Sequence, residues 1–305
     1  MGRLSVNLCG IELDNPLIPA SGTFGYGHEY AELYDINCLG SFSFKGTTLG
    51  PRFGNPTPRI AEAPAGLLNS VGLQNPGVRK VIEEELPKLR KVFQKPVIAN
   101  VSGFSIEEYV TVCEMLTREE QVGWLEVNVS CPNVHGGGMS FGTDPSAAAA
   151  VTRAVRAVTD KPLILKLTPN VSDISEIALA CEEAGADAIS LINTVLAMRI
   201  DLKTRKPVLA NVTGGLSGPA VFPLALRMVW QVSQAVHIPV LGLGGIQSAE
   251  NVIEMMLAGA TAVQIGSANL KDPYVCPRIL AELPELMDQL GIVKLRDIIG
   301  GAHHG

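Results

Sequence analysis

The sequence predicts a single α/β domain, residues 1–305, folded as a (β/α)8 barrel. Short apolar runs alternate with amphipathic helical patterns along the whole chain. The apolar runs are mostly continuous, which is typical of parallel strands buried on both faces. Eight such runs occur, the number that closes a barrel, and barrels of this kind commonly fill a chain of this length.

The eight predicted strands are short and rich in Leu, Ile and Val. They span residues 16–21, 41–45, 97–101, 124–129, 163–167, 188–193, 240–243 and 262–266. Helical patterns cover residues 109–116, 145–158, 172–183 and 248–257. Ser105 and Glu108 have the spacing of a capping box ahead of the first of these helices.

Two further features complete the predicted barrel. Residues 4–7 and 11–13 flank Cys9 and Gly10 and predict a β-hairpin that plugs the N-terminal face. Three long connections, residues 46–74, 131–144 and 194–218, are rich in Gly, Pro and Asn. They follow the carboxyl ends of strands, where barrel enzymes place their chemistry.

The composition excludes several classes of protein. A net charge of -6 with no basic block and 5% aromatic residues argues against nucleic acid and anionic membranes as partners. The sequence shows no signal-peptide pattern and no apolar stretch of about 18 residues. Its six cysteines form no CxxC pair, so we expect a protein of the reducing cytoplasm. We predict no metal site, because the pair His303 and His304 lacks a third ligand nearby in sequence.

Polar residues lie in or just after several of the apolar runs. They are Lys45, Asn100, Asn128, Lys166 and Asn193. Burying an amide or an ammonium without a partner costs several kcal/mol. These residues could bond to one another and to loop backbone, but their recurrence on successive strands favours a shared polar ligand. Lys45 and Lys166 are expected to be buried, and their ammonium groups would be unstable there without a counter-ion, so an anionic ligand is expected.

Glycines follow the last two predicted strands and indicate a phosphate site. Gly244 and Gly245 come after the seventh strand and Gly266 after the eighth. Glycines at these positions let backbone N–H groups approach a phosphate closely. Neither a GxGxxG motif after the first strand nor a GxxxxGK[ST] motif is present. The pattern therefore favours flavin mononucleotide (FMN) over a dinucleotide or ATP.

Cys131 directly follows the fourth predicted strand. An isolated cysteine there would usually be a buried structural residue. Here it begins a loop with three consecutive glycines and is flanked by Asn128 and Asn133. A thiol held over a substrate can act as a general base, and glycine-rich loops are common active-site lids. His135 is the alternative base or metal ligand, although its glycine neighbours favour an exposed side chain.

The stretch 128–133, Asn-Val-Ser-Cys-Pro-Asn, resembles the signature of class 1 dihydroorotate dehydrogenases. Class 2 members of this family carry Ser at the position of Cys131 and an N-terminal membrane segment. Residues 69–73, 165–167, 192–194, 214–218 and 244–245 match further family motifs in order. Residues 136–144 are similar to the class 1B loop rather than to that of class 1A.

The resemblance implies roles for individual residues. Cys131 would take the proton from C5 of dihydroorotate, while a hydride passes from C6 to FMN. The substrate would be held by Lys45, Asn69, Ser70, Val71, Gly72, Leu73, Asn128, Asn133, Asn193 and Thr194. FMN would be held by Ser21, Lys45, Gly46, Asn100, Asn128, Lys166, Ile192, Gly218, Gly244, Gly245, Gly266 and Ser267.

The resemblance also implies an assembly. Two catalytic chains would form a homodimer, and each would bind a partner subunit carrying FAD and a [2Fe–2S] cluster, which passes electrons to NAD+. The alternatives are a class 1A-type enzyme linked to fumarate, a flavoprotein similar to dihydropyrimidine dehydrogenase or dihydrouridine synthase, and a non-catalytic flavin-binding or assembly protein. Asn133 favours dihydroorotate, because pyrimidine-reducing relatives usually carry His there.

Overall fold

The structure, a computed structural model that describes residues 2–130 and 141–304, is built around a curled sheet of parallel strands. Its seven strands run in the order β3-β15-β14-β9-β8-β7-β6. They are β3 (Leu17–Pro19), β6 (Val97–Val101), β7 (Val122–Asn128), β8 (Leu163–Lys166), β9 (Ala188–Leu191), β14 (Val240–Leu243) and β15 (Ala260–Ile265). Except for the second, each predicted barrel strand therefore forms, with ends that match the prediction or differ from it by one or two residues.

Residues 41–47 close the sheet into a barrel. The amide of Ser43 donates to Pro19 O at 2.9 Å on one side, and that of Phe44 donates to Ile98 O at 3.1 Å on the other. Thr47 continues the contact by donating to Asn100 O at 2.9 Å. The prediction of a regular strand at 41–45 was wrong in detail, because the pairing is confined to isolated parallel bridges. The segment nevertheless occupies the eighth position, so the predicted (β/α)8 architecture is confirmed.

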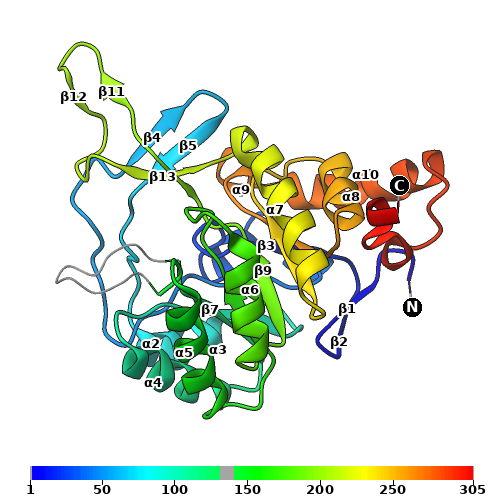
Figure 1. Ribbon diagram of the computed structural model, residues 1–305, viewed down its shortest axis with the longest axis horizontal. Coiled ribbons are helices and arrows are strands. Elements are labelled where there is room, and N and C mark those ends of the chain that lie inside the picture. The colour runs from blue at the N-terminus through cyan, green and yellow to red at the C-terminus, as the bar shows by residue number, and fades with distance from the viewer. Residues whose placement is uncertain (1, 131–140, 305) are drawn as a thin grey trace.

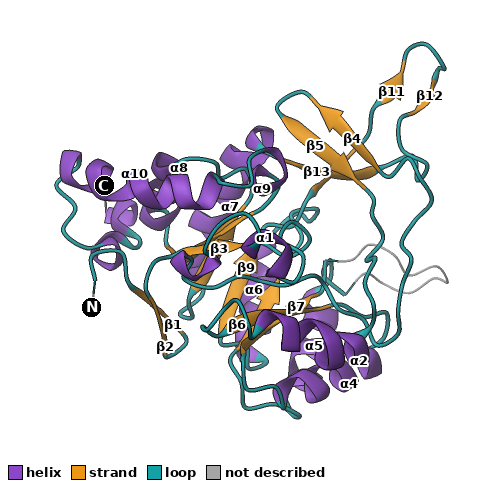
Figure 2. Ribbon diagram, turned by 180° about the vertical axis from the view of Figure 1, so that it is seen from behind, coloured by secondary structure: helices purple, strands orange, loops and turns teal. Residues whose placement is uncertain are grey.

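Helices pack around the outside of the sheet (Figure 2). The longer ones are α4 (Ile106–Thr117), α5 (Pro145–Arg156), α6 (Ile174–Glu183), α7 (Phe222–Ala235), α8 (Ala249–Leu257) and α10 (Val275–Gln289). Short segments are α1 (His28–Ala31), α2 (Val78–Lys80), α3 (Leu86–Leu89), α9 (Ala268–Lys271), η1 (Ile36–Cys38), η2 (Val81–Glu85), η3 (Pro219–Val221), η4 (Leu295–Ile298) and η5 (Gly301–His304).

Side-chain caps fix where several helices begin. The hydroxyl of Ser105 accepts from the amide of Glu108 at 3.3 Å, as the capping-box spacing predicts. Asp173 caps α6, and its carboxylate accepts from the amide of Ser175 at 2.8 Å. The helix predicted over 172–183 therefore starts at Ile174, after its cap, rather than at residue 172.

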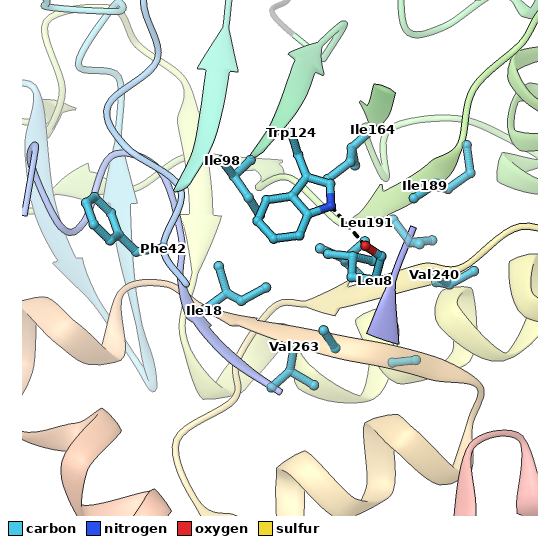
Figure 3. Close-up of a cluster of buried hydrophobic side chains, with 14 of the residues drawn as sticks. Leu8, Ile18, Phe42, Ile98, Trp124, Ile164, Ile189, Leu191, Val240 and Val263 are labelled. Carbon is cyan, nitrogen blue, oxygen red and sulfur yellow. Dashed lines mark hydrogen bonds between the residues drawn. The ribbon is translucent and has the colours of Figure 1, made fainter. Parts of the chain in front are cut away.

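The predicted N-terminal hairpin is present as β1 (Val6–Leu8) and β2 (Ile11–Leu13). Leu8 is fully buried, and its carbonyl accepts a hydrogen bond from Trp124 Nε1 at 3.1 Å (Figure 3). The Cys9 thiol donates to Asp187 O at 3.3 Å. Because Trp124 and Asp187 lie at the amino ends of β7 and β9, the hairpin packs against the N-terminal face, as predicted.

A second, antiparallel sheet stands beyond the opposite end of the barrel (Figure 1). Its strands run in the order β10-β13-β5-β4, with a separate hairpin of β11 and β12. They are β4 (Ile60–Ala63), β5 (Gly66–Asn69), β10 (Val195–Ala197), β11 (Ile200–Asp201), β12 (Lys206–Pro207) and β13 (Gly214–Ser217). Two of the long connections, 46–74 and 194–218, thus build one structure over the carboxyl ends of the strands. Of the third, residues 131–140 lie outside the described part.

Within residues 2–130 and 141–304, no helix combines the length and the apolar character that a membrane crossing requires. The expected cytoplasmic location and the single-domain organisation stay predictions.

The burial of Leu8 gives a direct test of the hairpin. Leu8→Ala should lower the free energy of unfolding by about 3 kcal/mol, because the side chain is fully buried against the barrel strands. The matched change Leu202→Ala, at a side chain that is 88% exposed on the outer hairpin, should cost less than about 0.5 kcal/mol. Urea denaturation measures both, and equal losses would contradict the plug.

Candidate active site

The strand register places polar side chains on one inward-facing surface. Residues two apart on a strand point to the same face, so Glu126 and Asn128 of β7 point the same way. In the sheet, Asn100 lies opposite Glu126, and Lys166 lies opposite both Asn128 and Ser190. The carboxyl half of the barrel interior is therefore polar.

Glu126 is the centre of this polar layer and is fully buried. Its Oε2 accepts from Asn100 Nδ2 at 2.6 Å and from Ser43 Oγ at 3.0 Å. Its Oε1 accepts from Gln264 Nε2 at 2.5 Å and from Ser190 Oγ at 2.9 Å. Two donors on each oxygen use the acceptor capacity of a carboxylate, and they come from four different barrel segments.

Lys166 is the counter-ion of Glu126. Its Nζ lies 3.8 Å from Glu126 Oε2 and 3.5 Å from Gln264 Oε1, and its side chain is 5% exposed. Burial alone would raise the pKa of Glu126, but the Lys166 ammonium and the hydrogen bonds from neighbouring side chains bring the pKa below its ordinary value. The expectation that Lys166 lacks a counter-ion within the chain was therefore wrong, and its charge alone does not demand an anionic ligand.

The hydrogen bond to Glu126 also fixes the orientation of the Asn100 side-chain amide. A carboxylate only accepts, so Nδ2 must face Glu126 and Oδ1 must face away. Among the described residues, this buried Oδ1 has no hydrogen-bond partner. A Cβ added at Gly46 would lie 2.9 Å from it. A buried acceptor without a partner is costly, so this oxygen is suited to receive a donor from a ligand.

A second cluster forms around Asn128. Its Oδ1 accepts from the amide of Ser130 at 3.2 Å and from Asn193 Nδ2 at 3.4 Å. The Ser130 hydroxyl donates to Asn128 Oδ1 and accepts from Asn193 Nδ2. Tyr109 fixes the backbone by donating to Asn128 O at 2.8 Å. Ser130 is the last described residue before the gap, so the predicted site residues Cys131 and Asn133, and the alternative base His135, lie outside the described residues.

The segment 69–73 lies beside this surface. Asn69 ends β5, and Leu73 approaches the barrel, since its Cδ2 would lie 3.7 Å from a Cβ added at Gly46. Gly72 and Leu73 both have positive φ angles, 78° and 57°, so the chain turns sharply between Asn69 and the barrel rim. The hydroxyl of Ser70 is buried and has no partner among the described residues. Val71 is held through its carbonyl, which accepts from the amide of Asn55 at 2.9 Å.

The position of the Thr194 side chain requires a glycine at residue 215. A Cβ at Gly215 would lie 1.9 Å from Thr194 Oγ1, so only glycine allows the approach. The amide of Thr194 donates to Asn193 Oδ1 at 2.7 Å. Thr194 and Asn193 are therefore fixed side by side at the end of β9, where Asn193 also reaches Asn128.

The predicted glycines meet at the ends of β14 and β15. A Cβ at Gly245 would lie 2.8 Å from Gly218 O, and one at Gly244 would lie 3.1 Å from Ile192 Cγ1. A Cβ at Gly266 would have nothing within 4 Å, so open space adjoins this backbone. Ser267 follows directly.

Two further predicted residues lie at the barrel rim. Ser21 is brought to the end of β15 by the bond from the amide of Ala20 to Ile265 O at 2.8 Å. Lys45 is only half-buried rather than fully buried, and its Nζ would lie 3.7 Å from a Cβ added at Gly22. The structure thus brings the described members of the predicted site to one end of the barrel.

Comparison with known proteins identifies the family. A family model described as "Dihydroorotate dehydrogenase" matches residues 3–287. The chain belongs to the dihydroorotate dehydrogenase family. A relative from Halalkalibacterium halodurans, named "Dihydroorotate dehydrogenase B (NAD(+)), catalytic subunit", is 56% identical over 302 residues, covering 99% of this chain and 99% of the relative.

Two more relatives with the same name agree. Those from Geobacillus sp. (strain WCH70) and Anoxybacillus flavithermus are each 57% identical over 300 residues, covering 98% of this chain and 96% of the relative. The resemblance to the class 1B catalytic chains of the dihydroorotate dehydrogenase family is confirmed, and with it the prediction of an oxidoreductase.

In this member of the dihydroorotate dehydrogenase family, the five described cysteines are free thiols. Burial raises the pKa of Cys9 and of Cys181 to about 12, and it raises the pKa values of Cys113 and Cys276 further. The pKa of Cys38 is raised for the same reason. These thiols keep their protons at neutral pH, so the structure gives none of the five the character of a base.

Glu126 and three residues that donate hydrogen bonds to it, Ser43, Ser190 and Gln264, are not among the predicted site residues. The signal was present, because Glu126 stands between Leu125 and Val127 in an apolar run. A carboxylate in such a run requires a buried partner.

The low pKa of Glu126 predicts an acid-dependent loss of stability. The group contributes fully above its ordinary pKa of 4.5, and this contribution is lost as the pH falls through the lower folded-state value. Glu126→Gln should lower the free energy of unfolding by about 3 kcal/mol at pH 7, because it leaves Lys166 without its counter-ion.

The difference between wild type and Glu126→Gln should shrink below pH 4.5. Urea denaturation across pH 3 to 7 measures it. The control Glu114→Gln removes a carboxylate from an exposed pair with Arg118 and should change little at any pH. A pH-independent difference for Glu126→Gln would contradict the ion pair.

Proposed function

We propose that this chain oxidises (S)-dihydroorotate to orotate with bound FMN, the oxidation step of de novo UMP biosynthesis. The observation that carries the proposal is the near-complete match, at 56% identity, to a protein named dihydroorotate dehydrogenase B (NAD(+)), catalytic subunit. The polar surface at the carboxyl end of the barrel supports it, because the described predicted site residues gather there.

The residues present fit a flavin. Asn100 Oδ1 has no partner among the described residues and is suited to accept from an N–H of the ring. The Lys166 ammonium has three N–H donors, and its described partners, Glu126 and Gln264, leave one of them for the ring. Gly244, Gly245 and Gly266 provide close backbone approach for a phosphate, with open space beside Gly266. When bound, the flavin supplies the acceptor for the hydride from C6 of dihydroorotate.

We propose that the remaining flavin contacts come from residues at the same rim. They are Ser21, Lys45, Gly46, Asn128, Ile192, Gly218 and Ser267.

The substrate would lie between the segment 69–73 and the Asn128 cluster. Asn69, Asn128 and Asn193 offer amides for ring carbonyls and N–H groups. Lys45 offers a positive charge for the carboxylate. Further contacts would come from Ser70, Val71, Gly72, Leu73, Asn133 and Thr194.

Cys131 would act as the base. As a thiolate it would take the proton from C5, while the C6–H bonding pair leaves as hydride. The electrons of the broken C5–H bond form the C5=C6 double bond of orotate. Dihydroorotate thus loses one proton and one hydride, a two-electron oxidation.

We propose a partner for the second half-reaction. The relatives are named as catalytic subunits of an NAD(+) enzyme. By analogy, this chain would form a homodimer within a heterotetramer, and a subunit carrying FAD and a [2Fe–2S] cluster would pass electrons to NAD+.

The base assignment predicts a large kinetic defect. In anaerobic stopped-flow, dihydroorotate should bleach the wild-type flavin, and Cys131→Ala should bleach it at least about 100-fold more slowly at neutral pH, because general-base catalysis contributes about that much or more. Cys38→Ala, at a thiol remote from the carboxyl end of the barrel, serves as the matched control. Equal rates for Cys131→Ala and wild type would remove Cys131 as the base.

If NAD+ is the final electron acceptor, its reduction should require the proposed iron–sulfur FAD subunit. The purified chain alone should reduce NAD+ poorly after dihydroorotate oxidation and should gain this activity when co-purified with an iron–sulfur FAD subunit. Efficient reoxidation of the lone chain by fumarate would instead support the class 1A-type alternative. Bleaching by dihydropyrimidines but not by dihydroorotate would support the other enzyme alternative.

A further inference from the structure

Glu126 lies behind both groups on which the proposed flavin site depends. The same carboxylate oxygen, Oε2, is bonded to Asn100 Nδ2 at 2.6 Å and lies 3.8 Å from Lys166 Nζ. Glu126 itself is fully buried. It therefore acts through its neighbours rather than by touching a ligand.

A purely structural role does not account for this arrangement well. Barrel interiors are usually filled by layers of branched apolar side chains, which stabilise the fold without any buried charge. Replacing a buried ion pair by apolar residues is often neutral or stabilising. Here one carboxylate gathers Ser43, Asn100, Ser190 and Gln264 from four segments. Because both oxygens of this carboxylate accept two hydrogen bonds, the network fixes the orientation of its members at the carboxyl end of the barrel.

We propose that Glu126 is a positioning residue that sets the charge met by the bound flavin. Its negative charge offsets that of Lys166, so that the cofactor contacts a nearly neutral pair rather than a bare cation. Its bond to Asn100 Nδ2 turns Oδ1 of that amide towards the site. This inference rests on the proposed function, because it requires a flavin against Lys166 and Asn100.

The charge of the pair should control how easily the flavin is reduced. Reduction increases the negative charge on the ring, and a nearby positive charge stabilises that form in a poorly solvated site. Removing the carboxylate leaves a net positive charge, and removing only the ammonium leaves a net negative one. The reduction potential should therefore be highest in Glu126→Gln, intermediate in wild type and in the double variant Glu126→Gln/Lys166→Met, and lowest in Lys166→Met.

The test is the midpoint potential of the flavin in the purified, FMN-loaded chain, measured against reference dyes without dihydroorotate. Glu126→Gln should shift the equilibrium towards the reduced form at least tenfold, which is about 30 mV for a two-electron couple. The matched control is Glu85→Gln, which removes a carboxylate bonded to His28 at 2.7 Å and Lys88 at 2.9 Å outside the barrel. It should leave the potential unchanged.

If Glu126→Gln does not fold, the comparison of Lys166→Met with the double variant replaces it, since the double variant contains no buried charge in this pair. The double variant should have the higher potential by a similar factor. An unchanged potential on losing Glu126, in either background, would overturn the inference.

This outcome is separable from a failure of the proposed function. A wild-type chain that retains no flavin, or whose flavin is not bleached by dihydroorotate, contradicts the function itself. A wild-type chain that retains and reduces its flavin, with no effect of Glu126→Gln on the potential, contradicts only the role of Glu126.

Discussion

The buried ion pair between Glu126 and Lys166 is the interaction on which the carboxyl end of the barrel depends. The pair is almost inaccessible to water, and each charge would be strongly unfavourable without the other. The side chains that stabilise Glu126 come from several barrel segments. Their contacts connect β7 to β6, β8, β9, β15 and the closing segment 41–47. The strands that carry the proposed flavin and substrate contacts are thereby fixed relative to one another.

The two ends of the barrel are built by different physical means. At the amino end, the hairpin of β1 and β2 buries Leu8 against Trp124 and neighbouring apolar side chains (Figure 3). At the carboxyl end, charges and amides replace apolar contacts, and glycines remove side chains where backbone must come close. The carboxyl end can therefore hold a polar group such as Asn100 Oδ1, which has no partner among the described residues and is suited to receive a donor from a ligand.

The sequence predicted the barrel well, because continuous apolar runs mark buried parallel strands whatever their partners. It misjudged residues 41–45, since an isolated bridge and a regular strand have the same local composition. It did not reveal the sheet of β4, β5, β10 and β13. That sheet pairs Asn69 with Gly215, and sequence periodicity carries no information about partners so distant in the chain.

The site was predicted in part for a similar reason. Polar residues at strand ends, such as Asn128 and Lys166, were recognised from position. The role of Glu126 was not, because the partners that make a buried charge acceptable come from other strands. Cys131 was recognised from its position after a buried strand and on a glycine-rich loop, and the family resemblance supplied its specific role and that of Asn133. Both residues lie outside the described residues and stay predictions.

A crystal structure of the chain with FMN and orotate tests the central claim most directly. The account predicts the flavin against Lys166 and Asn100, with Oδ1 of Asn100 accepting from the ring and the phosphate at Gly245 and Gly266. It also predicts orotate between the segment 69–73 and Asn193. A flavin bound elsewhere, or one that leaves Asn100 Oδ1 without a partner, would contradict it.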